Sequence, residues 1–441
     1  MPDISTYNGI DMGDIASING QDIASSGGGA YNPVSDSGTY TETVPSSGLI
    51  KYGGSKYSAT SYTSSDSTTR FNLGNDIVRN FSSDKDGRWP VVAESKSDFT
   101  HISYGRYSAM AITASGQLWE VGNQSSYLEG ATGTSFQQVT GVGDSDTGWT
   151  SVSSSYDGVL AINSGKMYYV GANSYGHAGT GNTTASYGTF TQVGSATDWQ
   201  KVVRCRNWSM ATKTSSNVLY TCGRNYNYQT GQDTSSGNTT SWTAINDDNF
   251  TNTSVTHFTS NYDGGILITN GEAYGWGDED SNERFGLNSS SNVQKPTAIG
   301  TVGGSLQTDW ASAALGTQQS FLINTSGELF FAGENGYGYT GDGTTTDHKA
   351  GNYVQVGSAT DYERASFDDA GQATTNYSCI KQRGGKLYFT GISYYGHIID
   401  VSDSIVTTDT LVNSSSLAAG NVWATTTQGG GTANPFLAAI Y

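Results

Sequence analysis

The feature that most constrains this chain is a seven-residue signature that returns along its length. Each copy starts with a small residue, continues as an aliphatic and aromatic strand, and has a second glycine six positions after the first residue. The copies begin at Gly48, Gly116, Gly165, Asn217, Gly271, Gly327 and Gly385. Regular recurrence of this kind constrains the architecture before any strand is assigned, because each repeat must be one supersecondary unit.

Each signature is one strand of a longer unit. An apolar strand precedes six of the copies and pairs with the signature as a hairpin, starting at Ser108, Gly158, Ser209, Gly264, Ser320 and Tyr377. Further upstream, an aromatic or aliphatic residue opens another strand, at Phe99, Trp149, Trp199, Val255, Trp310, Tyr362 and Trp423. A ragged fourth strand follows six signatures, at Phe136, Phe190, Trp242, Pro296, Tyr353 and Thr410. Openers spaced 50 to 61 residues apart are typical of four-stranded propeller blades.

The two ends of the repeat region are complementary fragments. After the seventh opener, Trp423, one more strand follows, PFLAAIY, which ends at Tyr441. We expect GLIKYGG, Gly48–Gly54, to supply the third strand of that blade and RWPVV, from Arg88, the fourth. Sharing one blade between both ends closes the ring and removes exposed sheet edges. The sequence therefore predicts an all-β fold, in which residues 48–441 form a seven-bladed β-propeller of four-stranded blades. An open β-solenoid would not explain the complementary ends.

The repeat resembles that of the regulator of chromosome condensation family. The segments that carry the likeness are GKMYYVGANSYGHAGTG at Gly165 and GELFFAGENGYGYTGDGTTT at Gly327. The resemblance covers roughly residues 48 to 441 and implies a seven-bladed propeller closed by strands from both termini. In the namesake, the propeller exchanges nucleotide on a small GTPase and docks on chromatin. Fold alone does not transfer that activity.

Residues 1–47 differ from the repeats and are predicted to be an N-terminal anchor with a Gly/Ser-rich tether. Two Asn-Gly pairs indicate two tight hairpins, each too small to be stable alone. The candidate anchor residues are Ile4, Asn8, Gly9, Ile10, Ile15, Ile18, Asn19, Gly20 and Ile23. This opening is similar to the N-termini of virion structural proteins of tailed bacteriophages, where such segments attach an appendage to the particle. A plain disordered tail is the alternative interpretation.

Charge and cysteine content exclude several classes of partner. Lys plus Arg number 21 against 39 Asp plus Glu, a formal net charge of −18, so nucleic acid would be repelled. The start lacks a secretory signal, and no apolar run is long enough for a membrane helix. We therefore expect a protein that is synthesised in the cytoplasm in soluble form and does not insert into a membrane. Three scattered cysteines, Cys205, Cys222 and Cys379, indicate buried thiols.

No catalytic motif emerges from the titratable residues. The five histidines, His101, His177, His257, His348 and His397, show no metal-ligand spacing. The acidic groups Asp278–Asp280 and Asp144 with Asp146 lack the pattern of a calcium loop and are interpreted as solvated surface. Phosphate-binding and serine-hydrolase motifs are absent from the sequence. We predict a non-enzymatic protein without cofactor or metal.

Loop aromatics are the best candidates for a binding surface. They follow the signature glycine and should crowd one rim of the ring: Tyr175, Tyr226, Tyr228, Tyr337, Tyr339, Tyr394 and Tyr395. Tyrosines can stack on sugars and donate hydrogen bonds, although packing between blade loops is the competing interpretation.

These features predict a bacteriophage virion protein present in multiple copies per particle. Residues 1–47 would bind a capsid or tail component, and the propeller would act as a decoration or as an adhesion head for a host surface glycan or protein. The alternatives are a carbohydrate-binding receptor-binding protein or depolymerase, and an intracellular interaction scaffold or exchange factor.

Overall fold

The computed structural model describes most of the repeat region and short strands near both ends. The described residues are 6–7, 10–11, 17–18, 21–22, 76–79, 99–104, 108–122, 133–155, 157–184, 186–233, 237–245, 254–279, 283–349, 351–367, 378–384, 386–392, 405–411, 422–424 and 437–440. Within these residues, no helix is long and apolar enough to cross a membrane.

Seven sheets of the described residues form the blades, numbered here in chain order. Blade 1 consists of β6 (Phe99–Tyr104), β7 (Ser108–Thr113), β8 (Leu118–Gly122) and β9 (Gly133–Gln138). Blade 2 consists of β10 (Trp149–Ser154), β11 (Gly158–Asn163), β12 (Lys166–Ala172) and β13 (Ser186–Gln192). Blade 3 consists of β14 (Trp199–Arg204), β15 (Trp208–Lys213), β16 (Leu219–Arg224) and β17 (Asn238–Ala244).

Blades 4 to 6 repeat the same pattern. Blade 4 consists of β18 (Val255–Ser260), β19 (Gly264–Thr269), β20 (Glu272–Gly277) and β21 (Val293–Ile299). Blade 5 consists of β24 (Trp310–Leu315), β25 (Gln319–Asn324), β26 (Leu329–Gly333) and β27 (Val354–Gln355). Blade 6 consists of β28 (Tyr362–Phe367), β29 (Ser378–Arg383), β30 (Lys386–Ile392) and β31 (Ile405–Leu411).

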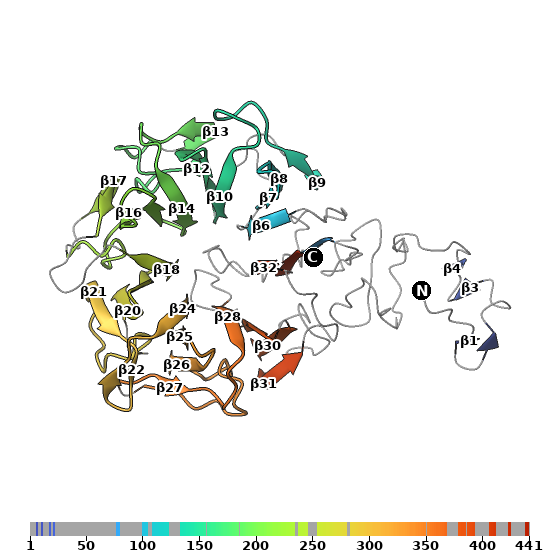
Figure 1. Cartoon of the computed structure of the whole chain (residues 1–441), viewed down its shortest axis with the longest axis vertical. Helices are drawn as coiled ribbons and strands as arrows, with labels where there is room; N and C mark the ends of the chain where they lie inside the picture. The colour runs from blue at the N-terminus through green and yellow to red at the C-terminus, as the bar shows by residue number, and fades with distance from the viewer. Residues whose placement is uncertain are drawn as a thin grey trace.

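In each of these six blades the strands are antiparallel and lie in chain order. Figure 1 shows the blades around a common centre, with the first strand of each one innermost. The predicted openers Phe99, Trp149, Trp199, Val255, Trp310 and Tyr362 are the first residues of these inner strands. The all-β propeller prediction is confirmed, including its strand order.

In blades 1 to 5, the first residue of the signature ties the blade to the next one. The carbonyl of Gly165, in the turn between β11 and β12, accepts a hydrogen bond from the backbone N–H of Trp199 at 2.9 Å. Gly271 and Trp310 form the same bond between blades 4 and 5, also at 2.9 Å. Gly165 has a φ of 79°, which glycine adopts at little cost. The periodicity therefore reflects a contact between blades, as well as a turn within one.

The second glycine of the signature allows close approach of two backbones. At Gly171, where φ is 119°, an added Cβ would collide with the carbonyl oxygen of Asp157 and with the Cα of Gly158. These residues belong to the connection between the first two strands of the same blade. A side chain at Gly171 would push that connection away from the third strand, which explains why the signature ends in glycine.

Blade 7 is shared between the two ends of the chain, as predicted. β32 (Val422–Ala424) pairs with β33 (Leu437–Ile440), and β33 pairs with β5 (Asp76–Arg79) in the order β32, β33, β5. Contacts of β32 and β33 with β6 join this sheet to blade 1 and close the ring (Figure 1).

The third strand of blade 7 corrects the sequence prediction. Gly48–Gly54 was expected to pair with the last strand, whereas Asp76–Arg79 does so, with Ala438 opposite Val78 and Ala439 opposite Ile77. The adjacent β-branched residues of β5 favour an extended strand, and the three glycines of Gly48–Gly54 weaken one. Gly48–Gly54 and the predicted fourth strand from Arg88 lie outside the described residues, as does the predicted domain boundary at residue 47.

The hydrophobic core lies largely between adjacent blades. One cluster joins blades 1 and 2 and contains Met110, Leu118 and Trp149. A larger one runs from blade 3 through blade 5 and includes Trp208, Trp276 and residues up to Tyr353. Burial between successive sheets fixes their relative positions, so loops at their ends are held on a rigid support.

Three additional two-stranded sheets complete the described strands. The predicted Asn-Gly hairpins appear as β1 (Thr6–Tyr7) with β2 (Ile10–Asp11), and as β3 (Ser17–Ile18) with β4 (Gln21–Asp22). Tyr7 pairs with Ile10 and Ile18 with Gln21, so two residues separate the paired strands in both hairpins. The third is β22 (Thr301–Val302) with β23 (Ser305–Leu306).

Candidate interaction surface

In blades 2 to 5, two kinds of connection meet at one end of the blade: the hairpin between the first and second strands, and the loop after the third strand. In blades 2 to 5, the loop after the third strand is held by a buried polar side chain at its start. The side-chain oxygen of Asn173 accepts a hydrogen bond from the backbone N–H of Ala178 at 2.8 Å, and Asn225 and Thr230 repeat the contact at 3.0 Å. We call this end of the propeller the loop face.

Glu279 plays the corresponding role in blade 4. The carboxylate of Glu279 is fully buried and accepts from the backbone N–H of Phe285 at 3.1 Å. Its loop is one residue longer than the loop that starts at Asn225, and the longer glutamate side chain spans the extra distance. The prediction that Glu279 belongs to a solvated acidic surface is therefore wrong. A buried carboxylate that binds a backbone N–H in this way is structural.

Each of these loops also contacts the following blade. The carbonyl of His177 accepts from the Ser209 hydroxyl at 2.7 Å, and the carbonyl of Gln229 accepts from the Trp276 indole N–H at 2.7 Å. The Thr390 hydroxyl donates to the carbonyl of Tyr339 at 2.8 Å in the same manner. The loop face is consequently stiff near its root, which places its outer side chains reproducibly.

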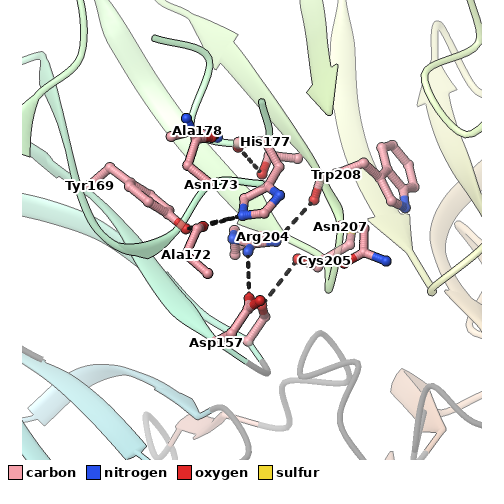
Figure 2. Close-up of polar contacts among 12 residues, drawn as sticks. Asp157, Tyr169, Ala172, Asn173, His177, Ala178, Arg204, Cys205, Asn207 and Trp208 are labelled. Carbon is pink, nitrogen blue, oxygen red and sulfur yellow. Dashed lines mark hydrogen bonds and ion pairs between the residues drawn. The ribbon is translucent and has the colours of Figure 1, made fainter. Parts of the chain in front are cut away.

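A buried polar cluster lies beneath the loop face between blades 2 and 3 (Figure 2). Arg204, with no exposed surface, donates from Nη2 to the Asp157 carboxylate at 2.8 Å, and its guanidinium carbon lies 5.9 Å from the centre of the Tyr169 ring. Burial raises the pKa of Asp157, and the positive charge of Arg204 opposes that rise. The ion pair links the Asp157 hairpin of blade 2 to the inner strand of blade 3.

His177 adjoins this cluster as a neutral imidazole. Its Nε2–H donates to the carbonyl of Ala172, and the hydroxyl of Tyr169 lies 3.2 Å from the same nitrogen. Burial lowers the pKa of His177 well below its usual value, and the charge of Arg204 lowers it further. Within the described part of the chain, Nδ1 has no hydrogen-bond partner, so a second proton there would be buried and unsatisfied.

Acidification should therefore destabilise the fold through His177. The folded pKa lies below the unfolded value, so the unfolded state takes up the proton first and stability falls as pH drops below about 6.5. One such group contributes a slope of up to about 1.4 kcal/mol per pH unit. We expect His177→Gln, which inserts the residue that blade 3 has at the same position, to reduce the loss of unfolding free energy between pH 7 and pH 5.

Urea unfolding of both proteins across that pH range measures the effect. The raised pKa of Asp157 acts with the opposite sign, but it is common to both proteins and cancels in the comparison. Identical pH profiles for wild type and His177→Gln would contradict the assignment of His177 as a buried neutral group.

Above this cluster, three tyrosines surround one arginine on the loop face. The guanidinium carbon of Arg224 lies 5.9 Å from the ring centre of Tyr175, 5.6 Å from that of Tyr226 and 5.5 Å from that of Tyr262. Arg224 also donates from Nη1 to the Tyr262 hydroxyl. Arg206 lies over the same Tyr262 ring at 5.4 Å. These five residues, from blades 2, 3 and 4, are called the tyrosine–arginine patch.

The patch is accessible and chemically suited to binding. Tyr226 is 54% exposed, whereas Tyr175, Arg224 and Tyr262 are half-buried and held by their mutual contacts. Within the described residues, Arg224 forms no ion pair with a carboxylate. Aromatic rings beside a guanidinium can stack on sugars or peptide groups and bind carboxylates, and tyrosine and arginine are enriched among residues that dominate binding energy.

Tyr228 adopts an unusual backbone conformation in this region. Its φ is 61°, where blades 2 and 5 have Gly176 at 75° and Gly338 at 74°. A bulky residue in the left-handed region costs about 1–2 kcal/mol relative to its preferred conformations. Strain of this kind at a loop position is typical of functional sites, and here it adjoins the tyrosine–arginine patch in sequence.

The other predicted tyrosines divide between packing and undescribed segments. Tyr339 is 1% exposed, and Tyr337 packs against the same cluster between blades 5 and 6. The competing interpretation, packing between blade loops, thus fits Tyr339. Tyr394 and Tyr395 lie outside the described residues. The repeat pattern does not predict Arg206, Arg224 and Tyr262 as site residues, although Arg206 and Tyr262 share one repeat position, seven residues after the first residue of their inner strands.

The remaining candidate groups have structural partners. Asp144 forms an ion pair with Lys166 at 2.7 Å, and Asp146 accepts from the backbone N–H of Gly141 at 2.8 Å. All three cysteines are buried free thiols, as predicted. Among the described residues, no group of three or more His, Cys, Asp or Glu side chains is placed to hold a metal ion.

Comparisons with known proteins support the fold. No protein-family model matches the chain, and no curated protein sequence does. Among solved structures, human WBSCR16 is 15% identical, with a TM-score of 0.62, and the match covers 78% of this chain and 87% of that one. Yeast RCC1 (Prp20), solved with Kap60, is 12% identical with a TM-score of 0.59, over 77% and 79% of the two chains. At these identities the likeness shows that the chain has an RCC1-like propeller fold, as its repeats predict.

Proposed function

We propose that this chain is a non-enzymatic interaction protein whose propeller presents the tyrosine–arginine patch as its binding surface. The observation that carries the proposal is the convergence of Tyr175, Tyr226 and Tyr262 on Arg224 at the accessible loop face. The neighbouring buried groups Arg204 and Glu279 have structural partners, which supports a role in binding over one in catalysis. Yeast RCC1 (Prp20), which has the same fold, was solved bound to a protein partner, Kap60.

The more specific proposal is a bacteriophage virion structural protein. In it, residues 1–47 anchor the chain to a capsid or tail component, and the propeller is the decoration or host-adhesion head. The two Asn-Gly hairpins support the anchor because strands of two residues bury too little surface to be stable alone and gain stability on a partner. An exposed tyrosine beside arginine suits a host glycan or protein surface.

The test is peptide mass spectrometry of purified particles together with two variants. We expect the wild-type chain in the particles, and loss of incorporation when residues 1–47 are deleted. Tyr226→Ala should be incorporated normally and should weaken host binding about 30-fold, the loss expected at a dominant contact residue. Leu306→Ala is the matched control, since Leu306 is 44% exposed on the β22–β23 hairpin and lies outside the patch.

For each part of the proposal, one experimental result would exclude it. Particles without the chain would exclude the virion role, and incorporation of the deletion variant would exclude the anchor. Host binding unaffected by Tyr226→Ala would exclude the patch as the adhesive surface. Specific capture of an intracellular host protein by a chain absent from particles would favour the scaffold alternative, for which the RCC1-like fold is the supporting observation.

A further inference from the structure

The tyrosine–arginine patch holds a positive charge that the described part of the chain does not neutralise. Arg224 is half-buried and donates from Nη1 to the Tyr262 hydroxyl. Among the described residues, its guanidinium forms no ion pair with a carboxylate. An arginine side chain carries several further N–H donors in a planar fork. These donors are available to an acidic group of a ligand.

The two carboxylates on the adjoining hairpins have other partners. Asp157 pairs with the buried Arg204 at 2.8 Å. Asp263, next to Tyr262 in the sequence, accepts a hydrogen bond from Gln229 Nε2 at 3.4 Å. Neither forms an ion pair with Arg224, so the patch contains a cation without a bound carboxylate.

Two tyrosines place accessible groups beside this cation. Tyr226 is 54% exposed, and the guanidinium carbon of Arg224 lies over its ring, 5.6 Å from the ring centre. Tyr175 contacts the same guanidinium from blade 2 at 5.9 Å. Within the described part of the chain, the hydroxyls of Tyr175 and Tyr226 form no hydrogen bond. A ligand bound at Arg224 would therefore meet an aromatic ring and hydroxyl groups together.

The third ring is fixed before any ligand binds. The hydroxyl of Tyr262 accepts from Asn207 Nδ2 at 3.3 Å as well as from Arg224, and its backbone carbonyl accepts from the indole N–H of the buried Trp208 at 3.2 Å. Arg206 lies over its ring at 5.4 Å. A site whose side chains are already held loses little conformational freedom on binding, which favours recognition of a small ligand.

The composition of the patch favours a sugar over a protein surface. Its five members are tyrosines and arginines, without an aliphatic side chain. The other exposed large hydrophobic side chains of the described residues lie elsewhere, on β23, β27 and β31: Leu306, Val354 and Ile405. A stable protein interface has an apolar core and buries about 800 Å² on each partner. A sugar ring needs less area, because it stacks on one aromatic ring and hydrogen-bonds to its neighbours.

Building on the proposed binding function of the patch, we propose that its ligand is a carboxylated sugar, such as a uronic acid residue of a glycan. Arg224 binds the carboxylate through parallel N–H donors, and the Tyr226 ring stacks on the sugar. Tyr175 supplies a hydroxyl to the same ligand. The net charge of −18 repels an acidic glycan from the rest of the surface, which confines its binding to the patch.

A glycan array that holds each carboxylated sugar beside its neutral counterpart tests the proposal on the full chain. We expect a preference of at least about tenfold for the carboxylated members. Arg224→Gln should abolish that preference, and Arg224→Lys should keep only part of it, because lysine lacks the planar fork. Tyr226→Ala should weaken binding to the carboxylated members.

The controls separate loss of the site from loss of the fold or of charge. Lys295→Gln removes one positive charge on outer strand β21, outside the patch, and should bind as wild type does. Thermal unfolding of each variant checks that it is folded. A folded Arg224→Gln protein that keeps the wild-type preference would overturn the proposal.

The remaining outcomes distinguish this ligand from the proposed function itself. Binding to no carboxylated sugar, or equal binding to neutral counterparts, would overturn the acidic sugar. Equal binding to sulfated counterparts would do so as well, because it would mean that charge alone is recognised. Host binding that requires Tyr226 but survives enzymatic removal of surface glycans would identify a protein ligand and leave the patch as the binding surface. Host binding independent of Tyr226 would instead exclude the patch.

Discussion

Replacement of Arg204 by methionine is expected to reduce the free energy of unfolding by about 3–5 kcal/mol. Arg204 has no exposed surface, and its guanidinium pairs with Asp157 at 2.8 Å. The variant leaves the Asp157 carboxylate between two blades without its cation, in surroundings that already raise its pKa. Urea unfolding followed by tryptophan fluorescence measures the loss from the shift of the midpoint.

Two comparisons isolate the cause of that loss. The double variant Arg204→Met with Asp157→Leu removes both charges, and we expect it to recover most of the lost stability, because a buried pair replaced by apolar side chains is often nearly neutral. Lys166→Met breaks the exposed pair with Asp144 and should change stability little. If Arg204→Met were as mild as Lys166→Met, the pair would not hold blades 2 and 3 together.

The inner strands and the signature strands could be predicted from sequence because their residues repeat for a backbone reason. Gly165 must accept from Trp199 across the blade boundary, and Gly171 must let two backbones approach, so both recur at fixed spacing. The third strand of blade 7 carries no such requirement in its sequence. Ile77 and Val78 pair with the last strand without a signature glycine, whereas Gly48–Gly54 carries the signature and is therefore predicted in their place.

The candidate site was only partly predictable, because its composition depends on which side chains from different blades meet. Tyr175 and Tyr226 were identified by their place after the signature glycine, but the same rule also selected Tyr339, which is buried between blades. What distinguishes them is Arg224, whose guanidinium contacts the first two and Tyr262. Such a contact between blades leaves no regular pattern in one sequence.

The repeats are similar in backbone and unequal in charge. Among the described residues, Arg204, Arg206 and Arg224 all belong to blade 3, while the corresponding positions of blade 2 are Ser154, Tyr156 and Ala172. A blade needs none of these arginines to form its sheet, since blade 2 forms the same four strands without them. The three arginines of blade 3 are therefore not needed for the propeller fold. Arg204 supports the loop face from beneath, and Arg206 and Arg224 belong to the tyrosine–arginine patch.

The second large loss of stability is expected on replacement of Trp208, where the hydrophobic core meets the tyrosine–arginine patch. Trp208 is fully buried, packs edge to face on Trp276 with ring centres 6.4 Å apart, and donates from Nε1 to the carbonyl of Asn261 at 3.0 Å. Its replacement by alanine should cost about 3–5 kcal/mol of unfolding free energy, from lost burial and the cavity left behind. Urea unfolding measures the loss.

Trp208→Phe separates packing from hydrogen bonding. Phenylalanine keeps most of the apolar contact but removes the N–H that also reaches the carbonyl of Tyr262 at 3.2 Å, so we expect a smaller cost of about 1–3 kcal/mol. Because that bond fixes the hairpin carrying Tyr262, Trp208→Phe should also weaken binding at the tyrosine–arginine patch while the fold persists. Unchanged patch binding in a folded Trp208→Phe protein would show that the Trp208 N–H does not set the position of Tyr262, whose hydroxyl also accepts hydrogen bonds from Arg224 and Asn207.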